Sequence, residues 1–348
     1  MQKIKIVLWG FGAMGRGMAE MLLEKDGVEI TGVCDLHKDF VNTSMIDHLN
    51  VANSMHPEVI ITDDIASLLN KDRCDLVLLA TDSFTKKAFP KMKQVLEAGI
   101  NCISTAEEMA YPQAQEPELS KELDVIAKEN GVTVLGTGIN PGFIMDLLVV
   151  ALSGTMKRVE HIEAERVNSL SPFGPAVMEE QGVGITLDTF EKGVQNKTLA
   201  GHVGFRESVG MIADALGVKL DGFKQQMKPI VTNVDRKSPY GEAKKGNVAG
   251  VNMTGQGLVD GKTFIDMKHP QQIEPEMEGT HTGDYIRIKG VPDINMAITP
   301  EIDGGIGTIA MCVNMIPHVL NARPGLKTMI DLPVPRAILG DMRDLLED

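Results

Sequence analysis

The sequence predicts an α/β protein in which a Rossmann-type, doubly wound parallel sheet is followed by a second α+β domain with an open mixed or antiparallel sheet. Three observations lead to this prediction. A short apolar run, Ile4 to Trp9, leads directly into a glycine-rich turn. Strand-like and helix-like segments then alternate as far as Leu135, which is typical of a parallel sheet covered by helices. Near Ile144 this alternation stops, and a succession of strand-like segments follows.

The turn after the first strand has the spacing of a dinucleotide-binding fingerprint. Gly10 permits a tight turn, Gly12 lets the backbone approach a pyrophosphate, and Gly15 lets the next helix pack closely on the strand. Met14 and Met18 begin an apolar helical face, so the phosphates would meet N–H groups at a helix N-terminus. The predicted cofactor-binding residues of this turn are Gly10, Phe11, Gly12, Ala13, Met14 and Gly15.

The second expected strand, residues 28–34, ends at Asp35. An acid about twenty residues past the last glycine accepts the hydroxyls of the adenosine ribose, and its charge repels the 2′-phosphate of NADP. Arg16, His37 and Lys38 lie close enough in sequence to offer that phosphate positive charge. We therefore expect NAD to be favoured and NADP tolerated. The structural alternative is a glycine-rich turn with an Asp nearby by chance.

The first domain continues as alternating strands and helices. The expected strands are residues 58–62, 76–80, 101–104 and 132–135, and the expected helices are residues 40–51, 64–69, 85–98 and 117–130. Parallel sheets bind ligands at the carboxyl ends of their strands. Ala80 and Thr81 follow one such end, and we expect them to contact the cofactor.

The second domain begins with an expected helix over residues 144–153. Strands are expected at residues 159–167, 228–234, 246–255, 262–267 and 284–289, with a helix near 207–216. Residues 304–320 form a long apolar helix, which we expect to pack back on the first domain. The predicted domains are therefore a dinucleotide-binding domain of residues 1–143, completed by 305–348, and a substrate-binding and dimerisation domain of residues 144–304.

Composition excludes several classes of partner. A formal net charge of -14 disfavours binding to nucleic acid or to an anionic membrane surface. We find neither an apolar run of about 18 residues nor a signal peptide before the first strand. The four cysteines are scattered and the eight histidines form no cluster with metal-ligand spacing. The expectation is a cytoplasmic enzyme with reduced thiols and no metal.

Two adjacent carboxylates, Glu107 and Glu108, follow the strand at 101–104. At this edge of the sheet a carboxylate can take a proton from a substrate ammonium or from an attacking water. The alternative is a helix N-terminus that carries Glu because its dipole favours negative charge.

The loop after the next strand, residues 136–143, is rich in glycine and contains Asn140 and Phe143. The Asn140 carboxamide can bind a nicotinamide or a substrate, and the Phe143 ring can cover the nicotinamide face. The alternative is a helix that Asn140 caps, with Pro141 at its first position.

Three residues of the second domain are candidates for substrate binding. Arg166 can bind a carboxylate through two parallel hydrogen bonds, although a salt bridge to Glu163 or Glu165 is equally compatible with the sequence. Asn168 lies two residues further along the same strand. His202 is surrounded by small residues, and its alternative is a structural histidine with satisfied hydrogen bonds.

Five sequence blocks together resemble the 2,4-diaminopentanoate dehydrogenase family. They are the glycine turn at 9–15, Ser104 to Glu108, Gly136 to Phe143, Gly304 to Thr308 and Asn321 to Leu326. The glycine turn is generic, whereas the Glu-Glu and Asn-Pro-Gly-Phe blocks are much more specific. The wider group is the native amine dehydrogenases, whose N-terminal domain is similar to that of dihydrodipicolinate reductase.

The resemblance implies an NAD(P)-dependent oxidative deamination of 2,4-diaminopentanoate to 2-amino-4-oxopentanoate and ammonia, in the fermentation of ornithine and other amino acids. It also implies a homodimer. In that group a glutamate after this strand is the acid/base, which corresponds to Glu107 or Glu108 here, with Glu107 preferred.

Two other functional classes remain as alternatives. A dihydrodipicolinate-reductase-like enzyme would carry an adjacent pair of histidines, and this sequence has none. A non-catalytic NAD(H)-binding redox sensor would keep Gly10, Gly12, Gly15 and Asp35 but would not need the two glutamates.

Overall fold

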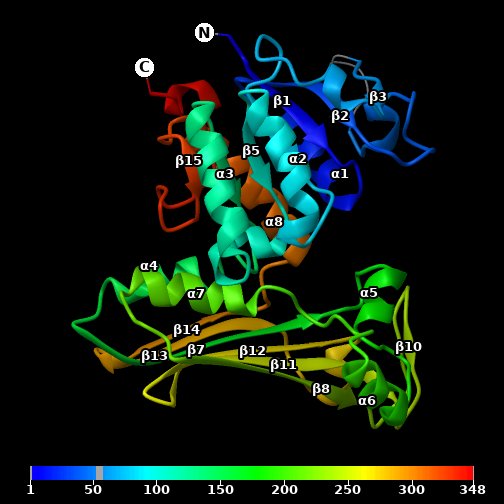
Figure 1. The fold of residues 1–348 in the computed structure, drawn as a ribbon. Coiled ribbons are helices and arrows are strands. Elements are labelled where there is room, and N and C mark those ends of the chain that lie inside the picture. Colours follow the sequence, from blue (N-terminus) through cyan, green and yellow to red (C-terminus); the bar gives the residue numbers. More distant parts are fainter. Residues whose placement is uncertain (1, 52–57, 348) are drawn as a thin grey trace. The chain divides into compact units, whose positions relative to one another are not determined.

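The computed structural model describes residues 2–51 and 58–347 (Figure 1). The chain divides into two compact units. Unit 1 comprises Met1–Phe143 with Asp303–Asp348, and unit 2 comprises Ile144–Ile302. The chain thus leaves unit 1 once and returns to it.

Unit 1 is built on a seven-stranded sheet with the strand order β15-β6-β5-β4-β1-β2-β3. Every neighbouring pair is parallel. The strands are β1 (Ile4–Trp9), β2 (Val28–Cys34), β3 (Ile61–Thr62), β4 (Leu76–Leu79), β5 (Asn101–Ser104), β6 (Thr133–Gly136) and β15 (Gly325–Lys327). The strand order reverses between β1 and β4, so the carboxyl ends of these two strands form the switch point at which such sheets bind ligands.

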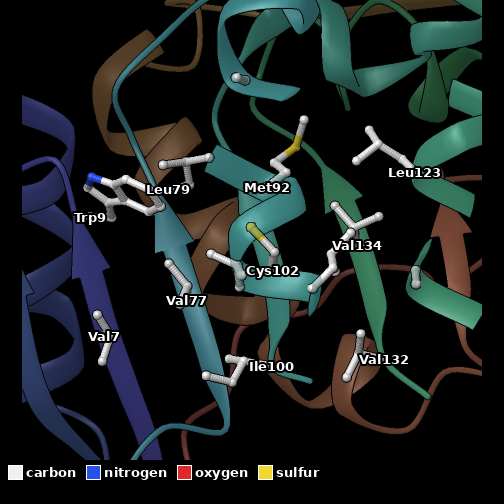
Figure 2. Close-up of a cluster of buried hydrophobic side chains, with 14 of the residues drawn as sticks. Val7, Trp9, Val77, Leu79, Met92, Ile100, Cys102, Leu123, Val132 and Val134 are labelled. Carbon is white, nitrogen blue, oxygen red and sulfur yellow. The ribbon is translucent and has the colours of Figure 1, made fainter. Parts of the chain in front are cut away.

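Helices cover both faces of this sheet, as a right-handed doubly wound connection requires. The helices are α1 (Ala13–Leu23), α2 (Thr85–Glu97), α3 (Pro117–Glu129), α8 (Gly304–Asn314) and α9 (Ile316–Leu320). Figure 2 shows the core beneath α2 and α3, where Val7, Val77 and Cys102 point from the strands toward Met92 and Leu123. The short apolar strands predicted from the sequence owe their composition to this burial on both faces.

Unit 1 differs from the sequence prediction at four segments, three of which lie between residues 40 and 69. The helix expected at 40–51 is absent, because Asn42 adopts a left-handed conformation with φ of 64° and its N–H bonds to Ile61. This segment holds only the 3₁₀ helix η1 (Met45–His48), and η2 (Ile65–Ser67) replaces the helix expected at 64–69. The predicted strand at 58–62 is reduced to β3 and an isolated bridge at Ile60.

The predicted long helix at 304–320 is two helices, α8 and α9. Asp303 begins α8, because its side chain accepts a hydrogen bond from the N–H of Ile306. The interruption at Met315 precedes Pro317, which has no N–H to bond to the carbonyl four residues earlier. Three further 3₁₀ helices complete unit 1: η3 (Glu107–Ala110), η4 (Pro112–Ala114) and η6 (Met342–Leu345).

Unit 2 contains a six-stranded sheet with the order β14-β13-β7-β12-β11-β8. Its strands are β7 (Arg158–Ser169), β8 (Gly222–Val231), β11 (Val248–Val259), β12 (Lys262–Gln272), β13 (Gly283–Val291) and β14 (Ile294–Ile298). Only β7 and β12 are parallel to each other, so the sheet is mixed. The predicted fold class is therefore confirmed for both units.

Helices α4 (Leu147–Ser153) and α7 (Phe205–Ala215) lie together along one face of this sheet (Figure 1). Gly255 and Gly257 of β11 permit this packing, since a Cβ at either position would lie within 3 Å of the Phe205 or Val209 side chain. The remaining elements of unit 2 are α5 (Pro175–Glu180), α6 (Leu187–Gln195), the hairpin β9 (Arg236–Lys237) and β10 (Glu242–Ala243), and η5 (Pro275–Glu278). The opposite face carries half-buried charges, among them Glu163, Lys268 and Arg287, which form ion pairs with one another.

Candidate active site

The glycine turn at the switch point leaves no room for other side chains at two of its positions. Gly10 has a φ of +97°, and a Cβ there would lie 2.5 Å from the carbonyl oxygen of Ala80 at the end of β4. A Cβ on Gly15 would lie 1.9 Å from the carbonyl oxygen of Gly10. The absence of a side chain at these two positions therefore allows β1, α1 and β4 to pack closely against one another.

Gly12 differs from the other two glycines because a Cβ at this position would meet no heavy atom of the described residues within 4 Å. Gly12 is the N-cap of α1, and no side chain caps this helix end. No acidic residue occupies the first turn either. An open approach to uncapped N–H groups is what a pyrophosphate requires, so the turn fits a dinucleotide.

A cavity of about 500 Å³, which we call the glycine-turn cavity, extends from this turn across the ends of β1 and β2. Among the residues that line it are Gly10, Gly12, Asp35, Asp63 and Thr81. The Asp35 carboxylate is fixed by two backbone N–H groups, from Phe11 at 2.5 Å and His37 at 2.7 Å. This places an acid at the end of β2 beside the phosphate turn, where a ribose would lie.

The sequence suggested three cations that could bind a 2′-phosphate. None of them, Arg16, His37 or Lys38, lines the glycine-turn cavity. The Arg16 guanidinium lies 5.9 Å from the centre of the Phe40 ring, and the His37 ring lies 5.2 Å from the same ring. The Nδ1 atom of His37 accepts a hydrogen bond from the backbone N–H of Asp39 at 3.3 Å. Lys38 is exposed.

Ala80 and Thr81 follow β4, and both line the glycine-turn cavity. The Thr81 hydroxyl donates to Asp82 at 2.6 Å and accepts from the Lys91 ammonium at 2.9 Å. Burial alone would raise the pKa of Asp82, but hydrogen bonds from Lys91 and Thr81 hold it below its usual value. Thr81 is therefore held in place by a charged pair.

A second cavity, of about 310 Å³, lies across the ends of β4, β5 and β6. We call it the glutamate cavity. Its lining includes Ala80, Thr81, Ser83, Thr105, Glu107, Asn140 and Thr308, together with Met14 of α1. Met14, Ala80 and Thr81 connect it to the glycine turn.

The structure gives the two adjacent glutamates different surroundings. Glu107 lines the glutamate cavity. Glu108 instead accepts a hydrogen bond from the N–H of Thr85, at the start of α2, at 2.8 Å. Its other oxygen accepts from Gln115 at 3.3 Å.

The Asn140 carboxamide is buried in this second cavity, and neither its oxygen nor its nitrogen has a hydrogen-bond partner among the described residues. It does not cap a helix, so that alternative is wrong. Helix α4 begins only at Leu147, whose N–H bonds to the side chain of Asp146. An unsatisfied buried amide is costly, and the amide of a nicotinamide or a polar substrate group would satisfy it. Phe143, the last residue of this part of unit 1, is half-buried and does not line the cavity.

In unit 2, the Arg166 side chain is committed to a structural ion pair. Its guanidinium is buried, and it bonds to Asp284 of β13 at 2.5 Å and to the carbonyl of Ile302. Burial raises the pKa of Asp284, although Arg166 opposes this effect. The alternative of a salt bridge is therefore observed, but with Asp284 in place of Glu163 or Glu165, which pair with Arg287 on the opposite face of the sheet.

Asn168 is buried and His202 is half-buried, both in polar surroundings. Asn168 lies on the same face of β7 as Arg166. The His202 ring packs against the His269 ring, with their centres 4.7 Å apart. Burial, with a contribution from Arg166, lowers the pKa of His202 to about 3, so this ring is neutral at physiological pH.

Sequence reasoning did not single out several residues that line the glutamate cavity. Ser83 and Thr105 lie at strand ends, where side chains of parallel sheets are expected to face ligands. Thr308 follows the glycines of α8, and its hydroxyl accepts a hydrogen bond from the N–H of Ile139 at 3.2 Å. The block Gly304 to Thr308, which contributed to the family resemblance, was the sequence feature that could have identified Thr308.

The thiols take no part in either cavity's chemistry. All four cysteines are buried and unbridged. Burial raises the pKa of Cys34 to about 11 and the pKa of Cys74 and Cys312 to about 12. In the part of the chain that the structure describes, no three His, Cys, Asp or Glu side chains gather as a metal site, and no helix has the length and apolarity to cross a membrane.

The switch-point turn, the acid at the end of β2 and the two cavities that share Ala80 and Thr81 define a nicotinamide-dependent oxidoreductase of the Rossmann class. Residues 4–137 match the NAD-binding Rossmann model of an oxidoreductase family, and residues 143–348 match the 2,4-diaminopentanoate dehydrogenase C-terminal domain. A 2,4-diaminopentanoate dehydrogenase from Acetoanaerobium sticklandii is 63% identical over 349 residues, which cover 100% of this chain and 98% of that relative. The chain belongs to the 2,4-diaminopentanoate dehydrogenase family, as the sequence blocks predicted.

Solved structures share the fold of this chain. An amine dehydrogenase from Mycobacterium smegmatis superposes with a TM-score of 0.85 at 26% identity, covering 97% of this chain and 98% of that one. A dihydrodipicolinate reductase from Paenisporosarcina sp. TG-14 shares the fold with a TM-score of 0.50 at 14% identity, covering 94% and 98% of the two chains. The predicted oxidoreductase class and nicotinamide cofactor are confirmed.

Proposed function

We propose that this protein oxidatively deaminates 2,4-diaminopentanoate at C4, giving 2-amino-4-oxopentanoate and ammonia, in the catabolism of ornithine and other amino acids. The observation that carries the proposal is that Glu107 and Asn140 line one cavity, which shares Ala80 and Thr81 with the glycine-turn cavity. The 63% identity to a 2,4-diaminopentanoate dehydrogenase supports the choice of substrate.

In this mechanism Glu107 moves two protons. It first takes a proton from the substrate ammonium, which frees the nitrogen lone pair to support loss of hydride from C4. A bound oxidised nicotinamide would supply the hydride acceptor, and loss of hydride from C4 would leave the substrate as an iminium ion. Glu107 would release its first proton to solvent and then take a proton from the water that adds to C4. It would return this proton to the nitrogen, so that the C–N bond breaks with its electron pair leaving on ammonia, while the C4 hydroxyl loses its proton and becomes the ketone.

The other residues of the glutamate cavity hold the reacting groups in place. Asn140 would hydrogen-bond the nicotinamide carboxamide or the substrate, and Thr81 would contact the nicotinamide ribose. The glycine-turn residues Gly10 to Gly15 would hold the pyrophosphate, and Asp35 the adenosine ribose. Orientation in a cavity with little water is the protein's contribution, since the cofactor supplies the redox chemistry.

We further propose that NAD is preferred and NADP tolerated. The Asp35 and Asp63 carboxylates line the glycine-turn cavity, and their negative charge would repel a 2′-phosphate. Lys91 is the one cation among the described residues that line it, and it is paired with Asp82.

We also propose that unit 1 is the dinucleotide-binding domain and that unit 2 binds substrate and forms a homodimer. Of the sequence candidates in unit 2, Asn168 and His202 are retained as substrate ligands, whereas Arg166 would act through its ion pair with Asp284. Phe143 stays a candidate for covering the nicotinamide. The buried, reduced thiols suit a cytoplasmic enzyme, and sedimentation equilibrium would test the dimer.

The proposal is tested by following the absorbance of reduced nicotinamide at mildly alkaline pH, with NAD and with NADP. The panel is 2,4-diaminopentanoate, ornithine, meso-diaminopimelate, alanine and homoserine. We expect strong turnover with 2,4-diaminopentanoate alone and a faster reaction with NAD. A protein that binds NADH but oxidises no amine would contradict the deaminase function and would favour a reductase or a redox sensor.

A further inference from the structure

The ion pair between Asp82 and Lys91 has its two partners in the linings of different cavities of unit 1. Asp82 lines the glutamate cavity, whereas Lys91 lines the glycine-turn cavity. Thr81, which bonds to both partners, lines both cavities. The pair therefore presents its negative partner to one cavity and its positive partner to the other.

Short hydrogen bonds fix this orientation. The Oδ2 atom of Asp82 accepts from the Lys91 ammonium and from the Thr81 hydroxyl, each at 2.6 Å. The side chains of Asp82 and Lys91 are 13% and 32% exposed, so solvent screens their charges less than it screens charges on the open surface. Burial acts to raise the pKa of Asp82, but the hydrogen bonds from Lys91 and Thr81 outweigh it and keep the carboxylate ionised.

Lys91 lies beside the glycine turn. Its ammonium donates to the Thr81 hydroxyl, and a Cβ on Gly10 would lie 2.9 Å from the Cγ2 atom of Thr81. The carboxylates that line the same cavity, Asp35 and Asp63, follow β2 and β3, which lie on the other side of β1. A pyrophosphate bound at the turn would therefore meet positive charge on its β4 side.

The glutamate cavity carries charge of the opposite sign. Among the described residues that line it, the ionisable side chains are those of Asp82 and Glu107, and both are carboxyl groups. Coulomb attraction would therefore favour a cation over a neutral group in this cavity. A nicotinamide ring carries a positive charge when it is oxidised and no charge when it is reduced.

We propose that the Asp82–Lys91 pair selects the oxidised cofactor, because Asp82 attracts the positive nicotinamide ring of NAD⁺ and Lys91 attracts the pyrophosphate. This inference rests on the proposed function for the placement of the nicotinamide in the glutamate cavity. NADH has the same pyrophosphate but a neutral ring. Asp82 would therefore strengthen the binding of NAD⁺ alone, whereas Lys91 would strengthen the binding of both forms.

This selectivity suits an enzyme that oxidises amines. Such an enzyme takes up the oxidised cofactor and releases the reduced one, so a contact that is lost when the ring charge disappears helps the product to leave. Asp82 acts in this account on cofactor binding, and Glu107 remains the group that moves protons.

The test measures the Kd values of NAD⁺, NADH and ADP by calorimetry for the wild type, Asp82→Asn and Lys91→Gln. ADP has a diphosphate but no nicotinamide. Asp82→Asn removes the negative charge and retains an oxygen for Thr81 and Lys91, which share one carboxylate oxygen in the wild type. Melting temperatures show that each variant is folded.

The matched controls are Lys93→Gln and Glu122→Gln. Lys93 lies on α2, as Lys91 does, and pairs with Glu122 of α3 at 3.2 Å. Neither residue lines the glutamate cavity or the glycine-turn cavity. Both controls should bind the three ligands as the wild type does.

For Asp82→Asn we expect the ratio of the Kd for NADH to the Kd for NAD⁺ to fall by about fivefold or more, because NAD⁺ alone loses an attraction. The Kd for ADP should not rise, since Lys91 is retained. For Lys91→Gln we expect the Kd values of all three ligands to rise by a similar factor, about threefold or more, without a fall in the ratio.

An unchanged ratio in folded Asp82→Asn would overturn the inference. Equal increases in all three Kd values for this variant would also overturn it, because they would indicate a structural role alone. If Asp82→Asn does not fold, the double variant Asp82→Asn/Lys91→Gln leaves no unpaired charge, and its ratio should lie below that of Lys91→Gln.

The outcomes also separate this inference from the proposed function, since the binding measurements need no amine. A protein that deaminates 2,4-diaminopentanoate but keeps the wild-type ratio in Asp82→Asn would contradict the inference alone. A protein that oxidises no amine but shows the expected change in the ratio would support the inference and contradict the proposed function.

Discussion

The Oε2 atom of Glu108 accepts a hydrogen bond from the backbone N–H of Thr85 at 2.8 Å, so Glu108 caps helix α2 from another segment of the chain. The N-cap residue of that helix, Phe84, has no side-chain oxygen to do this. Two adjacent carboxylates are thus divided between two tasks. Glu108 stabilises the fold, and Glu107 lines the cavity where we propose the chemistry occurs.

Removal of this cap should destabilise unit 1. Glu108→Ala leaves the first turn of α2 without its acceptor, which costs about 1 kcal/mol and lowers the melting temperature by about 2–4 °C. Glu108→Gln retains an oxygen acceptor and should lose less. Thermal unfolding monitored by circular dichroism measures both, and equal stability of Glu108→Ala and the wild type would show that the cap is unimportant.

The three glycines of the turn should respond differently to alanine. Gly12→Ala places a methyl group in open space, so the melting temperature should change little, whereas the Kd for NADH should rise about tenfold or more because the methyl group blocks the pyrophosphate. Gly15→Ala forces a clash with the Gly10 carbonyl and should destabilise the fold itself. Unaltered NADH binding by Gly12→Ala would place the phosphates elsewhere.

Charge at Asp35 should set the choice of cofactor. Asp35→Asn removes the negative charge and keeps one of the two oxygen acceptors, because the N–H groups of Phe11 and His37 bond to different oxygens of Asp35. We expect the ratio of kcat/KM for NADP to that for NAD to rise about tenfold, equivalent to ~1.4 kcal/mol. Asp63→Asn, in the same cavity, is the control and should change the ratio less. An unchanged ratio in Asp35→Asn would contradict the assignment of this residue.

The stability of unit 2 should fall in acid partly through Glu278. Hydrogen bonds from the Arg236 guanidinium and from Asn233 lower the pKa of Glu278 from 4.5 to about 2. A carboxyl group with a lowered pKa stabilises the fold above pH 4.5, and this contribution is lost as the pH falls from 4.5 toward 2. Glu278→Gln should therefore melt below the wild type at pH 7, and the difference should shrink toward pH 3. The exposed Glu276→Gln is the control, and a difference independent of pH in Glu278→Gln would be inconsistent with this linkage.

Local patterns allowed much of unit 1 to be predicted. The strand from Ile4 to Trp9, the helix after it and the acid at Asp35 follow from hydrophobic periodicity and glycine spacing, and all of these depend on residues near in sequence. The helix predicted at residues 40–51 is absent for a reason that is also local in sequence. Asn42 adopts a left-handed conformation there, which helical periodicity does not reveal.

The candidate site was less predictable where it depends on residues far apart in the chain. The spacing placed Glu107 and Glu108 at a strand end but could not separate them, since the partner of Glu108 lies 23 residues away at Thr85. Likewise, Arg166 finds Asp284 118 residues further on, because β13 pairs with β7 rather than because of any local motif. Contacts of this kind follow from strand order, which the sequence pattern does not specify.

The most direct test of the account compares Glu107→Gln with Glu108→Gln in the oxidation of 2,4-diaminopentanoate, with the Kd for NADH measured alongside. We predict that kcat of Glu107→Gln falls by about 10²–10⁴-fold, while NADH binding stays close to that of the wild type and Glu108→Gln remains active. If Glu107→Gln retains activity within about tenfold of the wild type, or if Glu108→Gln loses more, Glu107 is not the acid/base.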